Sequence, residues 1–174
     1  MERASNLSGG KATLARKGNP GHDITINGTA ISLKTEAAAN IKIDRVHISK
    51  FMELGRGVWE FNVLRERFFE HIKSYERILI LRCLSKLPSR LHYELVEIPK
   101  SLLEEAIHGV IREEINSKQN PKPGYCEVFD GDEIKFQLYF DAGTERKLQI
   151  RNISLKYCHV HATWKFSTND SSEL

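Results

Sequence analysis

Four side chains suited to handling a metal ion and a phosphate lie within residues 23–36: Asp23, Ser32, Lys34 and Glu36. A hard divalent cation such as Mg²⁺ takes carboxylate oxygens, waters and phosphate oxygens as ligands. It lowers the pKa of a bound water and neutralises charge that develops on a phosphate under attack. Asp23 would be the principal metal ligand, and Glu36 or the Ser32 hydroxyl would complete the shell. Lys34 would orient or deprotonate the attacking water, so the group suits hydrolysis of a phosphodiester.

A β-hairpin is needed to bring these side chains together. Two β-prone runs flank Asn27-Gly28, and an Asn-Gly pair is a strong hairpin signal because a type I′ turn needs positive φ at both central residues. We expect strands near 22–26 and 29–36. The turn brings Asp23 back beside the second strand, where alternation places the other three side chains on one face.

The rest of the chain predicts a mixture of helices and strands. Apolar spacing of three and four residues indicates helices, and β-prone runs indicate strands. We expect helices in the later part of 37–54, over 59–75, and from Ser101 to about Ile111. We expect strands over 77–82, 92–98, 133–140, 147–153 and 157–166. This order predicts an α/β or α+β domain, with a mixed central β-sheet flanked by helices.

Length and charge set the domain organisation and limit the partners. The 174 residues are enough for one domain with a sizeable core. We expect a flexible basic lead-in over 1–20, a single domain over 21–166 and a frayed tail over 167–174. A net charge of +3 tolerates a polyanionic partner without demanding one.

The sequence also favours a location inside the cell. No apolar run reaches the roughly 18–20 residues that cross a bilayer. The first 20 residues lack the apolar stretch of a secretory signal. Three cysteines far apart in sequence argue against a disulfide framework. We therefore expect a protein of the reducing cytoplasm, away from membranes.

Basic residues near the hairpin in sequence are candidate contacts to nucleic acid, because lysine and arginine contacts to phosphates supply most nonspecific affinity. The alternative is ordinary surface charge, and the sequence leaves both readings open. The candidates are Lys11, Arg16, Lys17, Lys50 and Arg56.

The arrangement of Asp23, a tight hairpin and then Ser32-Leu33-Lys34 resembles the PD-(D/E)xK motif of restriction endonucleases. That family places its first acid on one strand and (D/E)xK on the next. The resemblance puts Asp23 on the first acid and Lys34 on the lysine. It implies a Mg²⁺-dependent endonuclease of the type II restriction kind, with a restriction-endonuclease-like fold. It also implies double-stranded DNA as the substrate and a homodimer, since two-fold symmetry suits a palindrome.

This chain departs from the motif at two positions. Pro20 lies three residues before Asp23 rather than directly before it, and Ser32 occupies the place of the second acid. Family members with a non-acidic residue there recruit a carboxylate from elsewhere. Glu36 is the first choice for that role because it shares a face with the lysine, and Glu53 is the second.

The rival hypothesis is a non-catalytic nucleic-acid-binding or assembly subunit with a decayed nuclease site. Serine in place of an acid is what such decay would leave. Glu36 separates the two hypotheses. An active enzyme predicts that Glu36 points with Lys34 toward Asp23, whereas a decayed one has no reason to keep that arrangement.

Overall fold

The computed structural model describes residues 11–16, 21–38, 40–87 and 90–167. Within them, most of the chain is in two β-sheets. The first sheet has six strands, and β3 and β5 pair in parallel while the other neighbours pair antiparallel. In spatial order they are β1 (Ala12–Leu14), β2 (Ile24–Ile26), β3 (Thr29–Glu36), β5 (Arg77–Leu87), β6 (Arg90–Ile98) and β11 (His159–Ser167).

The second sheet has five strands, and all of its neighbours are antiparallel. In spatial order they are β4 (Arg45–Glu53), β10 (Lys147–Ser154), β9 (Glu133–Asp141), β8 (Gly124–Asp130) and β7 (Val110–Glu113). The helices are α2 (Phe61–Ile72) and α3 (Lys100–Glu104), with 3-10 turns over Glu105–His108 and Leu155–Tyr157. Strand β4 and helix α2 together make the crossover that a parallel β3–β5 pair requires.

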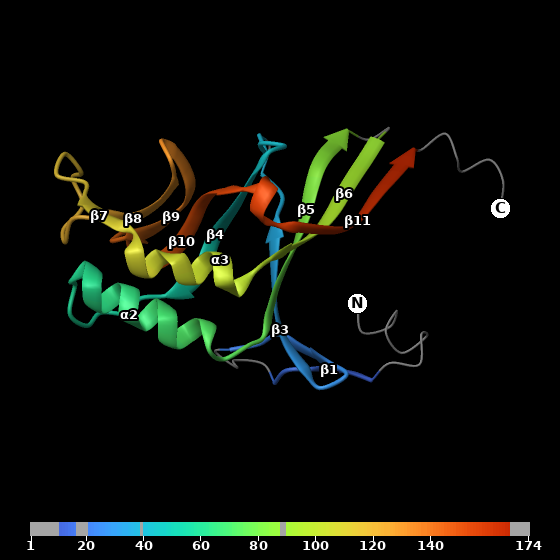
Figure 1. Ribbon diagram of the computed structural model, residues 1–174, viewed down its shortest axis with the longest axis horizontal. Coiled ribbons are helices and arrows are strands. Elements are labelled where there is room, and N and C mark those ends of the chain that lie inside the picture. The colour runs from blue at the N-terminus through green and yellow to red at the C-terminus, as the bar shows by residue number, and fades with distance from the viewer. Residues whose placement is uncertain (1–10, 17–20, 39, 88–89, 168–174) are drawn as a thin grey trace.

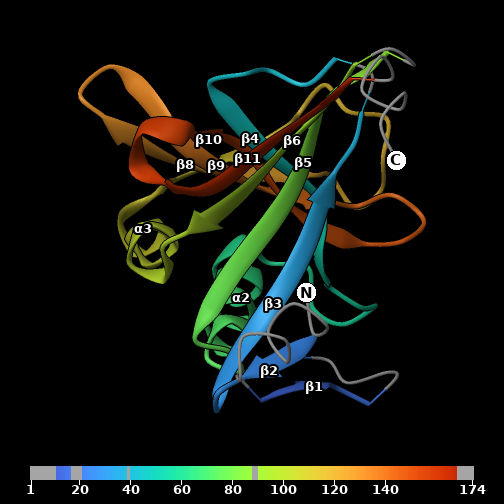
Figure 2. The ribbon, with the colours of Figure 1, turned by 90° about the vertical axis from the view of Figure 1, so that its right-hand side faces the viewer.

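One main core joins both sheets and the helices. Helix α2 buries Leu64, Phe68 and Ile72 on the face that meets the strands. In Figure 1 both helices lie below the second sheet, while β5, β6 and β11 of the first sheet extend away to the right. Figure 2 shows β3 and β5 running side by side past α2. A mixed sheet with helices against it is therefore confirmed, although strands predominate.

Alternation gives the first sheet two distinct faces. Ile78 and Ile80 of β5 belong to the main core, and we call their side the inner face. Leu79, between them, lies on the outer face in a small second cluster with Ile24 and Ile31. Because strand neighbours in register share a face, the inner face also carries Ser32, Lys34 and Glu36. All three therefore point toward the side where α2 and β4 pack.

The helix predicted in the later part of 37–54 is wrong, because Arg45–Glu53 form strand β4. Val46 and Ile48 alternate as buried β-branched residues, which suits a strand. A register shift then makes Phe51 the next buried position. The buried positions are therefore spaced by two and then three residues, a spacing that resembles a helical pattern.

The helix predicted from Ser101 is shorter than expected. It ends as a 3-10 turn at His108, and Val110 to Glu113 form β7, paired with β8. Gly109 marks the change, because a Cβ there would lie 2.4 Å from the Cys126 sulfur. The sequence reading missed β7 and β8. It correctly anticipated α2 and the strands β5, β6, β9, β10 and β11.

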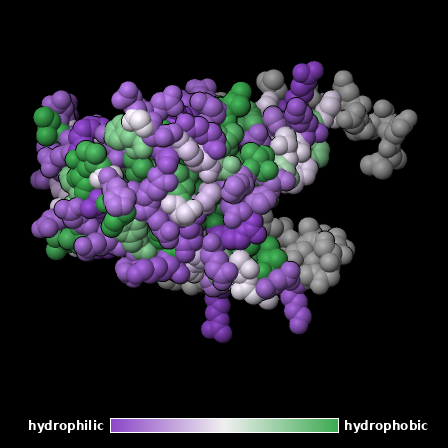
Figure 3. Space-filling model, viewed as in Figure 1, coloured by the Kyte–Doolittle hydropathy of each residue, from purple (hydrophilic) through white to green (hydrophobic). Residues whose placement is uncertain are grey.

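The ends of the chain are described only in part. Ala12 to Leu14 form β1 against β2, inside the segment expected to be a flexible lead-in. Lys17, Pro20 and residues 168–174 lie outside the described residues. Among the described residues, no helix combines the length and apolar character needed to cross a bilayer. Figure 3 shows hydrophilic and apolar side chains interspersed over the face in view.

Candidate active site on the first β-hairpin

The hairpin forms as predicted, with Ile24 opposite Ile31 and positive φ at both Asn27 and Gly28. Asp23 extends the pairing by one step, because its N–H donates to the Ile31 carbonyl at 2.9 Å. Its carboxylate Oδ2 accepts hydrogen bonds from the Leu33 N–H at 2.6 Å and the Ser32 hydroxyl at 3.3 Å. Hydrogen bonds to a charged acceptor are strong and directional, so the exposed carboxylate is held against β3.

A close backbone approach holds the segment ahead of Asp23 against the turn that follows α2. A Cβ on Gly21 would lie 3.0 Å from both Cβ and Oγ of Ser74. A larger residue at position 21 would require the Ser74 side chain to move by a few tenths of an ångström. The close contact at Gly21 therefore places the segment that leads into Asp23 against the turn that contains Tyr75.

Lys34 lies half-buried on the inner face, with its ammonium nitrogen 5.8 Å from the centre of the Phe51 ring. Burial lowers the pKa of Lys34 below its ordinary value, and the negative charge of Asp23 partly opposes that shift. A lysine with a lowered pKa gives up its proton more readily, as general-base lysines do. The amine is thus placed near a carboxylate in a partly dry environment.

Aromatic rings from β4 and α2 form the wall behind Lys34. The Phe51 ring centre lies 5.6 Å from that of His71 and 6.4 Å from that of Tyr75, and His71 lies 5.6 Å from Tyr75. Burial, followed by the charge of Lys34, lowers the pKa of His71. Burial and the nearby charge of Asp23 raise the pKa of Tyr75 well above its ordinary value. His71 and Tyr75 are therefore close enough to feel the charges of Lys34 and Asp23, respectively.

The Tyr75 hydroxyl is the polar atom that this wall leaves unsatisfied. Tyr75 is 1% exposed, and its hydroxyl has no hydrogen-bond partner within the described part of the chain. A buried hydroxyl without a partner costs roughly 1–3 kcal/mol. The sequence places Tyr75 only at the end of the helix expected over 59–75. No local pattern distinguishes Tyr75 from an ordinary packed tyrosine.

Glu36 does not join this group. Its buried carboxylate forms an ion pair with Arg82 at 2.8 Å and accepts the His47 N–H at 3.1 Å. Burial raises the pKa of Glu36, while the bond from Arg82 opposes that rise. Four residues of strand separate Glu36 from Ser32, which is about 13 Å. The structure thus brings Asp23, Ser32 and Lys34 together and directs Glu36 to another partner.

Arg82 is the centre of that other network. It is fully buried on β5 and also binds the Glu94 carboxylate at 3.1 Å. Its guanidinium donates to the carbonyls of Lys42 and Arg45 at 2.6 and 2.8 Å, which fixes the connection between β3 and β4. One feature of the sequence indicates this network, because Arg82 interrupts the apolar run of β5. Its partners become evident only once β3, β5 and β6 are in register.

The residues present meet part of what a divalent metal needs. Within the described residues, no three His, Cys, Asp or Glu side chains converge in a metal-binding group. Mg²⁺ nevertheless binds through as few as one carboxylate, with waters and substrate phosphates as its other ligands. Asp23 fits that role. Glu53, the second-choice acid, lies at the exposed end of β4, bonded to Lys50 at 2.9 Å.

The candidate DNA-contacting residues lie at two places beside the site. Lys11 and Arg16 are exposed on either side of β1, and the Lys11 backbone bonds to Asn27 in the hairpin turn. Lys50 and Arg56 are exposed on β4 and just after it. The first place adjoins the hairpin, which carries Asp23 and Lys34. The second adjoins Phe51 of β4, whose ring lies near Lys34.

Comparison with known proteins places this chain in a family. A family model for SmaI, described as a type II site-specific deoxyribonuclease, matches residues 1–166. The type II restriction enzyme SmaI of Serratia marcescens is 52% identical over 163 residues, covering 92% of this chain and 66% of that enzyme. No solved structure matches. The expected kinship with type II restriction enzymes is confirmed, and the chain belongs to the SmaI family of type II site-specific deoxyribonucleases.

Proposed function

We propose that the protein is a Mg²⁺-dependent endonuclease that hydrolyses phosphodiester bonds in double-stranded DNA at a specific sequence. The observation that carries the proposal is the Asp23 carboxylate, bonded across the hairpin to the strand that bears Lys34. Membership of the SmaI family supports the reaction class. SmaI of Serratia marcescens is itself named a type II restriction enzyme, and this chain spans 66% of its length.

Each residue of the group has a defined part in the proposed reaction. A divalent metal, when bound, supplies a more acidic water and offsets charge on the phosphate. Asp23 would hold that metal, with its carboxylate oriented by the Leu33 N–H and the Ser32 hydroxyl. Lys34 would take or orient a proton of the attacking water, helped by its lowered pKa.

Glu36 supports the site indirectly in this proposal. It could act as the second metal ligand only by giving up its bonds to Arg82 and to the His47 N–H. That would leave a buried arginine with one fewer partner, which is costly. We therefore assign Glu36 to holding the β3–β4 connection, with waters and phosphate oxygens filling the metal shell.

The remaining parts of the proposal concern partners and location. Lys11, Arg16, Lys17, Lys50 and Arg56 would contact the DNA backbone and set the orientation of the duplex. Two copies would cut the two strands of a symmetric site as a homodimer. Unpaired cysteines favour a reducing cytoplasm.

A second function has two observations in its favour. Glu36 is already ion-paired, and no group of three metal-binding side chains forms among the described residues. Those facts favour a non-catalytic nucleic-acid-binding or assembly subunit, because an active enzyme was expected to point Glu36 with Lys34 toward Asp23. Such a protein would bind DNA without cutting it.

Cleavage of plasmid DNA with and without Mg²⁺ separates the two functions. We expect wild-type protein to cut only with the metal, and Asp23→Asn to lose cutting while remaining folded. Asp132→Asn, at an exposed turn between β8 and β9, is the matched control and should cut normally. Undiminished cutting by Asp23→Asn would move the metal site elsewhere. A wild-type protein that binds DNA but never cuts it would favour the non-catalytic subunit.

A further inference from the structure

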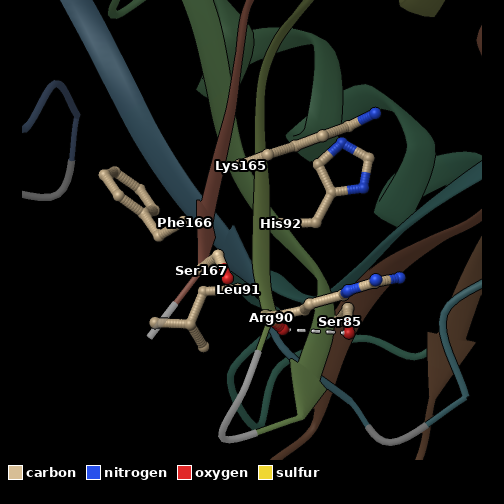
Figure 4. A pocket seen from close by; sticks show the side chains of 7 residues that line it. All are labelled: Ser85, Arg90, Leu91, His92, Lys165, Phe166 and Ser167. Atoms are coloured by element: carbon tan, nitrogen blue, oxygen red, sulfur yellow. Dashed lines mark hydrogen bonds between the residues drawn. The ribbon is translucent and has the colours of Figure 1, made fainter. Parts of the chain in front are cut away.

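A hollow of about 480 Å³ lies at the far end of β5, β6 and β11, away from Asp23. Its polar lining comes mainly from Ser85, Arg90, His92 and Lys165, and Leu91 and Phe166 form an apolar rim. Figure 4 shows Arg90, His92 and Lys165 pointing to the same side of the strands, while Phe166 points to the other. Arg90, His92 and Lys165 of β6 and β11 therefore present polar groups to one side of the sheet, while the Ser85 hydroxyl of β5 donates to the Arg90 carbonyl at 3.2 Å.

Strand register places this hollow on the same face as the proposed active site. Ser85 lies opposite His92, and His92 lies opposite Lys165, so the three share one face. His92 is also an even number of residues from Val96, which belongs to the main core. The face that carries Lys34 on β3 thus carries a basic cluster toward its β11 edge.

The positive charge of the hollow has no acidic partner in the described residues. None of the residues lining it is acidic, and neither Arg90 nor Lys165 forms an ion pair there. The His92 Nε2 atom is buried and also lacks a hydrogen-bond partner in that part of the chain. Arg82, nearby on β5, is by contrast neutralised by two carboxylates. Two cations without an ion pair among the described residues, beside an imidazole, are suited to an anion.

The spacing between the two sites matches the scale of a DNA duplex. Four residues along the strands and three strand spacings across the sheet separate Lys34 from Lys165, or about 20 Å. The same length covers about six base pairs at about 3.4 Å per step. We propose that this hollow binds a backbone phosphate of the DNA, about six base pairs from the scissile bond.

This inference rests on the proposed function, because it names a contact that the same substrate would make. A phosphate held by Arg90 and Lys165 reads no base sequence, and it fixes how the duplex lies relative to Asp23. The hollow also has room for more than a single phosphate group, so a sugar or a bridging water can accompany it.

Binding of a fluorescent 30-base-pair duplex in EDTA, followed by anisotropy across a range of salt, tests the inference without cleavage. We expect Arg90→Gln and Lys165→Gln each to raise Kd several-fold. Each should also reduce the slope of log K against log salt by about one, as loss of a phosphate contact does. Lys118→Gln is the matched control, an exposed lysine between β7 and β8, and should bind as wild type.

The outcomes separate this inference from the proposed function. Wild-type binding by both variants would overturn the phosphate site, and so would an equal loss in Lys118→Gln, which would indicate a general charge effect. If the wild-type protein cuts plasmid and the variants bind normally, this inference alone fails. If the wild-type protein never cuts but the variants bind DNA weakly, the proposed cleavage fails and the phosphate site stands.

Discussion

Strand β3 takes part in two groups of a carboxylate and a cation that are used in opposite ways, although Lys34 and Glu36 are only two residues apart. In the first group, which we call the open end, the exposed Asp23 carboxylate lies near Lys34 and near the unsatisfied Tyr75 hydroxyl. In the second group, which we call the satisfied end, Glu36 and Arg82 form a buried pair whose bonds extend into the backbone of the β3–β4 connection. A carboxylate beside a cation is therefore no sign of a reactive site. What distinguishes the proposed active site is an exposed carboxylate and a buried hydroxyl without a partner among the described residues.

The largest expected effect comes from removing the amine at the open end. Lys34→Met keeps an unbranched side chain of similar bulk without the amine, and should lower the cleavage rate by about 10³-fold, within the range for loss of a general acid or base. The single-turnover rate at saturating DNA measures it. A fall in affinity with an unchanged rate would instead make Lys34 a binding residue.

The same variant should change stability in a direction set by pH. The pKa of Lys34 is lowered on folding, so the folded protein binds fewer protons than the unfolded chain. Wild-type stability should therefore rise as pH increases from the folded pKa toward the unfolded value near 10.4. The stability of Lys34→Met lacks this pH dependence. Its free energy of unfolding should exceed that of wild type most at neutral pH. Urea unfolding at pH 7 and pH 10 compares the two proteins.

Removing the buried partner of Glu36 should lower the free energy of unfolding more than it lowers the cleavage rate. Arg82→Met leaves Glu36 and Glu94 without their buried partner, and loss of one member of a buried pair costs about 3–5 kcal/mol. Urea denaturation measures this loss. The double variant Arg82→Met with Glu36→Gln should recover part of it, because one uncompensated charge is then removed. A single variant as stable as wild type would show that the network is not structural.

Much of the open end was readable from sequence, and the satisfied end was not. The Asn27-Gly28 turn fixes the local pairing, so the positions of Asp23 and Lys34 follow from two residues and strand alternation. The partner of Glu36 depends on β5 lying beside β3, a pairing made across a long crossover. Strand β4 was misread because its register shift imitates helical spacing. Patterns in the local sequence do not predict side-chain partners that depend on the pairing of distant strands.

The smallest expected effect tests the unsatisfied hydroxyl beside Asp23. Tyr75→Phe should raise the free energy of unfolding by about 1 kcal/mol, because it removes a buried polar group that lacks a partner. Thermal unfolding measures the gain. A lower melting temperature would mean that the hydroxyl forms a hydrogen bond in solution.

The most direct test of the divide along β3 compares Asp23→Asn with Glu36→Gln, measuring the single-turnover cleavage rate and the melting temperature of each. We predict that Asp23→Asn cuts about 10³-fold more slowly with an unchanged melting temperature, because it alters the proposed metal ligand. Glu36→Gln should melt at a lower temperature yet cut at close to the wild-type rate well below that temperature. Loss of cutting by Glu36→Gln with full stability would contradict this account and make Glu36 a metal ligand.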